Sequence, residues 1–289
     1  MLEFLLSQST LVGILISVSL ATTVGLLTYV VAYKLIYRYQ TQDLKDPTGQ
    51  LFRLLGILVS LMLSLAFAEV IADMRDNEKA IEREVVTIAD TFNDLYRYDA
   101  DVTQKSRTLL IAYTQAVIDD DWPALAENTL GKHTTKFRRQ FEESAWQLEP
   151  ATSVQEQLKS EILKDIDAIF EYRIVRLDNA LAEPPFYLYI IIFGFLLTMS
   201  TFGCYKPQGP LIILVSFYTV FVGLVLYLIL AMSDPFQGGT GLEPTTFKVL
   251  VESLRTFKGW GEPDGCRLRQ DMQVVLIVVR YLICCNCAY

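Results

Sequence analysis

The sequence predicts an all-α integral membrane protein whose four transmembrane helices form two hairpins that flank a helical-bundle extramembrane domain. Three observations predict this fold class. The 289-residue chain is 52% hydrophobic and only 20% charged, whereas soluble domains average about 45–50% and about 25%. Four nearly uncharged runs carry the excess, and each has roughly the 20 residues that cross a bilayer. The acidic residues are concentrated between the second and third runs.

The first transmembrane hairpin is expected over residues 1–72. Its first apolar run, Leu11–Ala32, follows a stretch without Lys or Arg. A cleavable signal peptide has a basic start and an apolar core of about 7–15 residues, so this run is interpreted as a retained transmembrane helix. A polar link that contains Pro47 and Gly49 leads to the second run, Leu54–Ala72.

Residues 73–184 are predicted to form an acidic helical extramembrane domain. They hold 23 acidic and 14 basic residues, a net charge of −9, while the whole chain carries −8. This acidity argues against nucleic acid as a partner. Apolar residues recur at steps of four and three from Ile81 to Leu95, as in a helix with one apolar seam. Because no Gly or Pro intervenes from Ile57 to Ala100, the second span should continue into this helix.

Two sequence signals mark further helix boundaries in this domain. The segment Asp119–Pro123 predicts that one helix stops and the next begins, with Asp121 as the N-cap and the proline in the first turn. Ser153 and Glu156 have the spacing of a capping box, in which the side chains at the start of a helix bond to its free backbone N–H groups. A long helix should follow and end before the third span.

The second transmembrane hairpin is expected over residues 185–234. Its two apolar runs are Pro185–Cys204 and Pro210–Met232. Residues 235–257 should form a post-membrane turn and an amphipathic helix. We assign no structure to the atypical tail, residues 258–289, whose apolar stretch of about 8 residues is too short to span a bilayer.

Two strips of small residues are candidate functional features. In each of the first two spans, a small residue recurs at every fourth position. The first strip consists of Gly13, Ser17, Ala21 and Gly25, and the second consists of Gly56, Ser60, Ser64 and Ala68. Residues four apart share a helix face, and small side chains let another helix backbone approach closely in lipid. Helix packing is therefore the favoured interpretation, and the alternative is that the two serines of the second strip face the water of a pore.

No residue pattern points to catalysis, a metal or a cofactor. His133 is the only histidine, in a stretch expected to be exposed, and we find neither a nucleotide-binding glycine motif nor a calcium loop. The only candidate ionisable residues within the membrane are Glu69, near the end of the second span, and Asp73 one turn later. The absence of charge at mid-membrane argues against a proton-coupled transporter. We expect neither an enzyme nor a resident cofactor.

The layout and three local strings resemble the bestrophin-like membrane family, a bacterial family of unknown function that is distantly similar to the bestrophin anion channels. The strings are RLLGILVSLMLSLAFAEV in the second span, YTQAVIDDDWPAL in the middle, and LILAMSDPFQGGTGLEPTTF after the fourth span. The most specific motif is Asp234-Pro235-Phe236 with Gly238 two positions on. It looks like the Asn-Pro-Phe-Gly turn that follows the last span in bestrophins.

The resemblance implies a pentameric ion channel in the cell membrane, with anions passing passively through a central pore. It also implies that the helical domain and both termini lie in the cytosol; basic residues flank the two sides of the membrane in equal number, so charge alone leaves the orientation open. Gln237–Gly241 replaces the acidic calcium-binding run of bestrophins, and Ile57–Val70 has no match to their aromatic constriction. Calcium gating and neck residues are therefore not carried over.

The alternative function is a membrane-anchored scaffold or signalling protein without transport activity. In that case both small-residue strips only pack helices, and the acidic domain docks a partner. The docking site would be an exposed corner formed by Trp122 and Pro123, together with the three aspartates that precede it.

Overall fold

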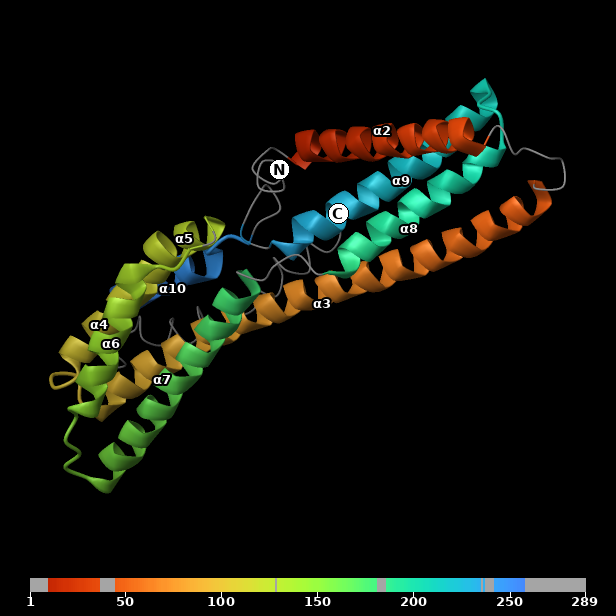
Figure 1. Ribbon diagram of the computed structural model, residues 1–289. Coiled ribbons are helices and arrows are strands. Elements are labelled where there is room, and N and C mark those ends of the chain that lie inside the picture. Colours follow the sequence, from red (N-terminus) through yellow and green to blue (C-terminus); the bar gives the residue numbers. More distant parts are fainter. Residues whose placement is uncertain are drawn as a thin grey trace. The chain divides into compact units, whose positions relative to one another are not determined.

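The computed structural model is all-α over the residues that it describes. These residues are 10–36, 45–127, 129–180, 186–234, 236 and 242–257, and they contain no strand. Four of the helices are long and apolar enough to cross a membrane, which confirms the predicted fold class and the predicted spans. They are α2 (Thr10–Ile36), the first part of α3 (Lys45–Tyr98), α8 (Tyr187–Thr201), which ends in a 3-10 turn (Phe202–Cys204), and α9 (Gly209–Ser233) (Figure 1).

The chain folds into two compact units. The membrane unit runs to Arg75 and resumes from Ala182 to Gly241, and the bundle unit contains Asp76–Leu181 and the residues from Leu242 onward. Helix α3 contributes to both units as one uninterrupted helix of 54 residues. The second span therefore continues into the extramembrane domain, as the absence of Gly and Pro predicted.

In the membrane unit, α3, α8 and α9 share an apolar core. Its buried members are Leu63, Ala66, Val70, Leu188, Ile191 and Ile229. The three α3 residues follow steps of three and four, so they occupy one helix face. Helix α2 packs against α9 and α8, as Figure 1 shows. Towards the C-terminal end of α2, the Tyr29 hydroxyl donates a hydrogen bond to the Tyr205 carbonyl at 3.1 Å.

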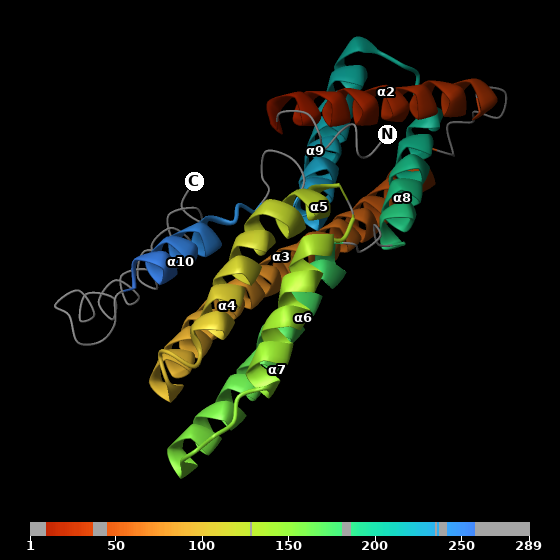
Figure 2. The same cartoon turned by 90° about the vertical axis from the view of Figure 1, so that its left-hand side faces the viewer.

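The bundle unit consists of the second part of α3 and of further helical segments. They are α4 (Gln104–Ala116), a π turn η3 (Val117–Asp121), α5 (Trp122–Ala126), α6 (Lys132–Trp146), α7 (Ser153–Ala180) and α10 (Thr245–Thr256). Figure 2 shows α4 between α6 and α10. The predicted apolar seam of α3, from Ile81 to Leu95, is buried. Amphipathic α10 is also confirmed, with Phe247 and Leu254 on its buried face.

The predicted helix boundary at Asp119–Pro123 is confirmed in part, because α5 begins at Trp122 with Pro123 in its first turn, but the predicted cap and interruption are wrong. The chain passes from α4 through the π turn into α5 without leaving the helical conformation, and Asp121 has φ −66° and ψ −49°. Asp121 makes no capping hydrogen bond. Tertiary contacts override the local signal, because the Asp120 and Asp121 carboxylates bond to α6 and α7 instead of to their own helix.

The capping box of α7 lies one residue earlier than predicted. Thr152 Oγ1 accepts a hydrogen bond from Gln155 N at 3.2 Å, and Gln155 Oε1 accepts one from Ala151 N at 2.9 Å. Ser153 is the first helical residue. Threonine and glutamine satisfy the capping pattern as well as serine and glutamate do, so two overlapping boxes were available and the chain uses the first.

Candidate functional site

The small-residue strip on α2 is a packing surface for α9, as favoured from the sequence. Ser17 Oγ donates a hydrogen bond to the Gly223 carbonyl at 3.2 Å. A Cβ atom at Gly223 would lie 2.8 Å from Cβ of Ala21, and one at Gly13 would lie 2.6 Å from Cε2 of Tyr227. At Gly223 the neighbouring atoms are a Cβ and backbone, which cannot move aside, so the two helices approach each other this closely because glycine occupies that position.

The strip on α3 has different surroundings. A Cβ atom added at Gly56 would meet nothing within 4 Å among the described residues, and Ser60, Ser64 and Ala68 are exposed. The serine hydroxyls donate to carbonyls one turn back in the same helix, Ser60 to Gly56 at 2.7 Å and Ser64 to Ser60 at 2.9 Å. This strip therefore lies outside the apolar core of its own subunit.

The acidic residues near the end of the α3 span are also exposed. Glu69 accepts a hydrogen bond from the Tyr187 hydroxyl of α8, and Asp73 lies one turn further along α3. Neither carboxylate is enclosed by the described membrane helices, which fits carboxylates that reach the headgroup water.

Two of the four residues of the predicted post-membrane turn are described. Asp234 directly follows α9, and Phe236 is buried with an exposed fraction of 6%. Pro235 and Gly238 lie outside the described residues.

A buried cluster of charged side chains in the bundle unit was missed by sequence reasoning. Both Asp121 oxygens accept hydrogen bonds from Arg173, from Nε at 2.8 Å and from Nη2 at 2.9 Å. Arg176 Nη2 lies 3.3 Å from Asp121 Oδ2 and 3.5 Å from Glu84 Oε1. Glu84, Asp121 and Arg176 are fully buried, and Arg173 is 4% exposed. The cluster joins α3, the π turn and α7.

Glu84 has the weakest charge pairing in this cluster. Its Oε1 accepts a hydrogen bond from the Tyr113 hydroxyl of α4 at 2.9 Å, and its Oε2 has no hydrogen-bond partner among the described residues. Burial raises the pKa of the Glu84 carboxyl, and the nearby Asp121 carboxylate adds to this, although Arg176, Tyr113 and Arg173 oppose it. The ionised carboxylate is thus costly to bury and depends on Arg176.

The heptad spacing of α7 is a sequence signal for this cluster. The buried α7 residues Ile162, Ile166, Ile169, Arg173, Arg176 and Ala180 follow steps of four, three, four, three and four. Two arginines at seam positions of an apolar helix need buried carboxylates opposite them.

The predicted docking corner at Trp122 and Pro123 is wrong, because Trp122 is only 8% exposed. Its Nε1 donates a hydrogen bond to the Leu242 carbonyl at 2.8 Å, and its ring packs edge-on against Phe247 at 5.7 Å. The aspartates before it also take part in hydrogen bonds within the bundle. Asp120 Oδ2 accepts hydrogen bonds from the first turn of α6, including His133 N at 2.7 Å. His133 itself is exposed, as expected.

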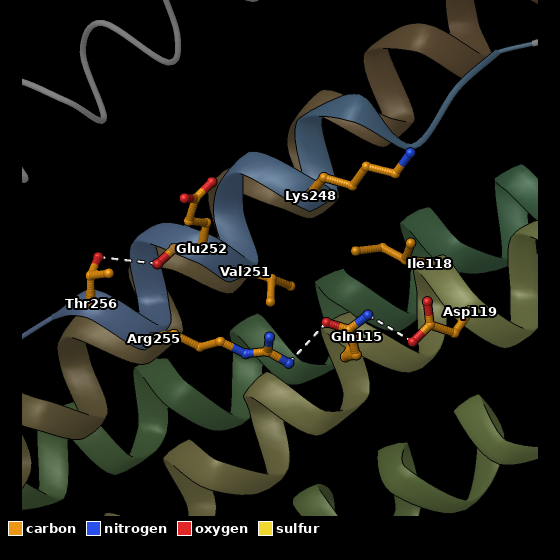
Figure 3. A pocket seen from close by; sticks show the side chains of 8 residues that line it. All are labelled: Gln115, Ile118, Asp119, Lys248, Val251, Glu252, Arg255 and Thr256. Carbon is orange, nitrogen blue, oxygen red and sulfur yellow. Dashed lines mark hydrogen bonds between the residues drawn. The ribbon is translucent and has the colours of Figure 1, made fainter.

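A pocket of about 580 Å³ lies between α10 and the α4–π-turn segment (Figure 3). Arg255 Nη2 donates a hydrogen bond to Gln115 Oε1 at 3.0 Å, and Gln115 Nε2 donates one to Asp119 at 2.7 Å. Lys248 and Glu252 also line it, so basic and acidic groups are balanced and no ligand charge is favoured. Among the described residues, no group of three or more His, Cys, Asp or Glu is placed to hold a metal ion.

The four spans and the helical bundle define a multi-pass all-α membrane protein. The family model of the Bestrophin-like domain matches residues 18–247, and the chain belongs to this Bestrophin-like family. No curated protein sequence matches the chain.

Solved structures of bacterial bestrophin homologues share this fold. One point variant of the homologue from Klebsiella pneumoniae superimposes with a TM-score of 0.61 at 14% identity, over 84% of this chain and 97% of that chain. A second variant gives 0.61 at 14% identity, over 84% and 99%. A structure described as a membrane protein gives 0.62 at 14% identity, over 83% and 96%. These identities establish similarity of fold alone.

Proposed function

We propose that the chain assembles into a homo-oligomeric channel that conducts inorganic ions passively through a central pore lined by α3. The observation that carries the proposal is that the two small-residue strips have different surroundings. The α2 strip is covered by α9, whereas Ser60, Ser64 and Ala68 of α3 are exposed in the subunit and half-buried Gly56 has no described atom within 4 Å of its Cβ position. In a closed ring of subunits, one face of each subunit lines the symmetry axis, and the α3 strip is the candidate for that face.

Small and hydroxylated side chains suit a pore wall. They leave space for hydrated ions, and their oxygen atoms offer water and ions weak contacts that permit both entry and exit. The neighbouring exposed residues of α3 are large and apolar, including Leu58 at 55% and Leu65 at 63% exposed, and they suit lipid or a second subunit. Conduction is proposed to be passive because coupled transport normally uses ionisable groups within the membrane.

Membership of the Bestrophin-like family supports further details of the proposal. Five subunits, anions as the conducted ions, a location in the cell membrane and a cytosolic bundle follow from the resemblance to bestrophins. We propose no enzymatic activity and no cofactor. The scaffold alternative lost its candidate docking site, because Trp122 and Asp121 are buried inside the bundle.

Purified protein reconstituted into planar bilayers tests the proposal. We expect ion currents from the wild type, and we expect Ser64→Trp to block them by filling the pore. Leu27→Trp is the matched control, since Leu27 is 62% exposed on α2, and its currents should persist. A well-folded oligomer that gives silent bilayers would contradict the proposal, and so would a native mass that shows only a monomer or dimer.

A further inference from the structure

Helix α10 is fastened to the rest of the bundle unit at both ends. Near its start, the Leu242 carbonyl accepts the hydrogen bond from Trp122, and the Phe247 side chain is fully buried. Near its end, the Phe257 ring packs edge-on against Phe92 at 5.6 Å and Tyr96 at 5.1 Å. Aromatic pairs of this geometry stabilise a contact beyond the effect of the buried area alone. Between these ends, Leu250, Val251 and Leu254 form the rest of the buried face of α10.

Arg176 connects the start of α10 to the buried ionic cluster. Its guanidinium carbon lies 5.1 Å from the centroid of the Trp122 ring and 5.4 Å from that of Phe247. On the other side its Nη2 atom reaches Asp121 and Glu84. Its Nε and Nη1 atoms have no hydrogen-bond partner among the described residues. The aromatic rings therefore cover a cation whose hydrogen-bonding capacity is only partly used.

The charges in this cluster balance only while Glu84 is ionised. Among the described residues, the titratable or charged groups that act on Glu84 are Tyr113 from α4, Asp121 from the π turn, and Arg173 and Arg176 from α7. Both oxygens of Asp121 already accept hydrogen bonds from Arg173. Glu84 is therefore the group that balances the charge of Arg176.

A neutral Glu84 would leave one positive charge uncompensated in a fully buried position. Breaking a buried ion pair on one side is costly because the remaining charge stays desolvated. The cost falls if the guanidinium reaches water. Trp122 and Phe247 lie over it, so such access requires Phe247, and with it the start of α10, to move away.

We propose that Glu84 and Arg176 form a proton-operated latch for α10, which is docked while Glu84 is negatively charged and loosened when Glu84 binds a proton. This inference concerns a conformational control within the bundle unit and does not depend on whether the protein conducts ions. The direction of the Glu84 pKa shift agrees with it, because burial brings protonation closer to neutral pH.

Hydrogen–deuterium exchange on the full-length protein in detergent tests the latch. Exchange of the α10 amides is compared at pH 7.5 and 5.5 after correction for the intrinsic rates. In the wild type we expect exchange in α10 to be about tenfold faster at the lower pH, which corresponds to about 1.4 kcal/mol of lost protection. Glu84→Gln should show the faster exchange at both pH values.

Asp165→Asn is the matched control. Asp165 lies on α7, and burial together with Asp94, Asp90 and Glu161 raises its pKa to about 6. It is not among the groups that act on Glu84. This variant therefore removes a different titration, one that lies between the two test pH values, and should keep the wild-type response of α10.

The double variant Glu84→Gln/Arg176→Met separates the latch from a general loss of folding. Methionine retains much of the apolar volume and leaves no uncompensated cation, so α10 should be protected at both pH values. Equal protection of α10 in the wild type and in Glu84→Gln would overturn the proposal. If Glu84→Gln also speeds exchange in α6, the single variant has lost folding more generally. Exchange of α10 in the double variant then tests the latch: a protected α10 supports it, and an unprotected α10 overturns it.

Discussion

The two small-residue strips of the membrane unit have the same spacing and opposite surroundings. On α2, Ser17 and its neighbours meet α9 so closely that Gly223 cannot carry a side chain. On α3, Gly56 has open space around it and the serines bond only to their own helix. The difference lies in the partner, since α9 supplies a glycine opposite the first strip. A four-residue spacing therefore identifies a surface for close approach but not what approaches it.

The largest effect is expected from Gly223→Leu. The new side chain would collide with Ala21 and with the backbone of Val18, which lies 3.1 Å from the Cβ position. Because backbone atoms cannot move aside, we expect a loss of about 3 kcal/mol, or a Tm lower by roughly 6–12 °C. Thermal unfolding in detergent measures this. A wild-type Tm would show that α2 and α9 are not in close contact.

Gly56→Leu is the corresponding change on α3 and should leave Tm within about 2 °C of the wild type, since no neighbour in the subunit opposes it. If the strip lines a pore, the oligomer persists and the current falls by more than half. If the strip instead packs against a second subunit, the native mass decreases. Size measurement and bilayer recording on the same preparation distinguish these outcomes, and a collapse of Tm would contradict both.

A smaller contrast is expected between Ser17→Ala and Ser60→Ala. Ser17 donates to a carbonyl of another helix, whereas Ser60 donates within its own helix. Loss of the interhelical bond should cost about 0.5–1.5 kcal/mol, and loss of the local bond close to zero. Equal changes in Tm for the two variants would remove the distinction between the strips.

The smallest effect is expected in the bundle unit, where the Asp121 carboxylate is paired with Arg173 whereas Asp165 lies mainly near other acidic groups. The pKa of Asp165 is raised to about 6, first by burial and then by Asp94, Asp90 and Glu161. The folded state thus binds this proton at a higher pH than the unfolded chain does. Stability from this group rises as pH falls through 6, and the gain is complete below about 4.

Asp165→Asn should accordingly stabilise the protein at pH 7 and leave it nearly unchanged at pH 4. The gain at pH 7 is expected to be below about 1 kcal/mol, because the carboxyl is partly exposed and solvent screens its neighbours. Tm profiles of both proteins from pH 4 to 7 measure the effect. Parallel profiles would show that Asp165 does not titrate in this range.

The sequence predicted those elements whose signal is spread over many residues. Four long apolar runs, the uninterrupted stretch from Ile57 to Ala100 and the amphipathic face from Phe247 to Leu254 each combine many weak preferences that agree. Single local signals were less informative. Asp121 does not cap α5, and the α7 cap uses Thr152 instead of Ser153, because distant carboxylate contacts and a neighbouring equivalent motif decided these positions.

The candidate sites were harder to predict because they depend on pairing between distant segments. Arg173 and Arg176 lie 52 and 55 residues from Asp121, and Glu84 lies 92 residues from Arg176. From the charge count, these residues belonged to an acidic extramembrane domain, and nothing in that count indicated that they are buried. The α3 strip was recognised as a surface for close approach, but a single chain does not contain the second subunit that would complete a pore.

The π turn positions two consecutive aspartates so that they bind two different helices. Asp120 accepts a hydrogen bond from α6, and Asp121 accepts one from α7. A π turn closes over five residues where an α turn closes over four. Deletion of Ile118 would convert it to an ordinary turn and rotate the following chain by about 100° relative to α4. The carboxylates would then lose their partners together. The number of residues in Val117–Asp121 is thus constrained more strictly than the identity of an exposed residue such as Pro123.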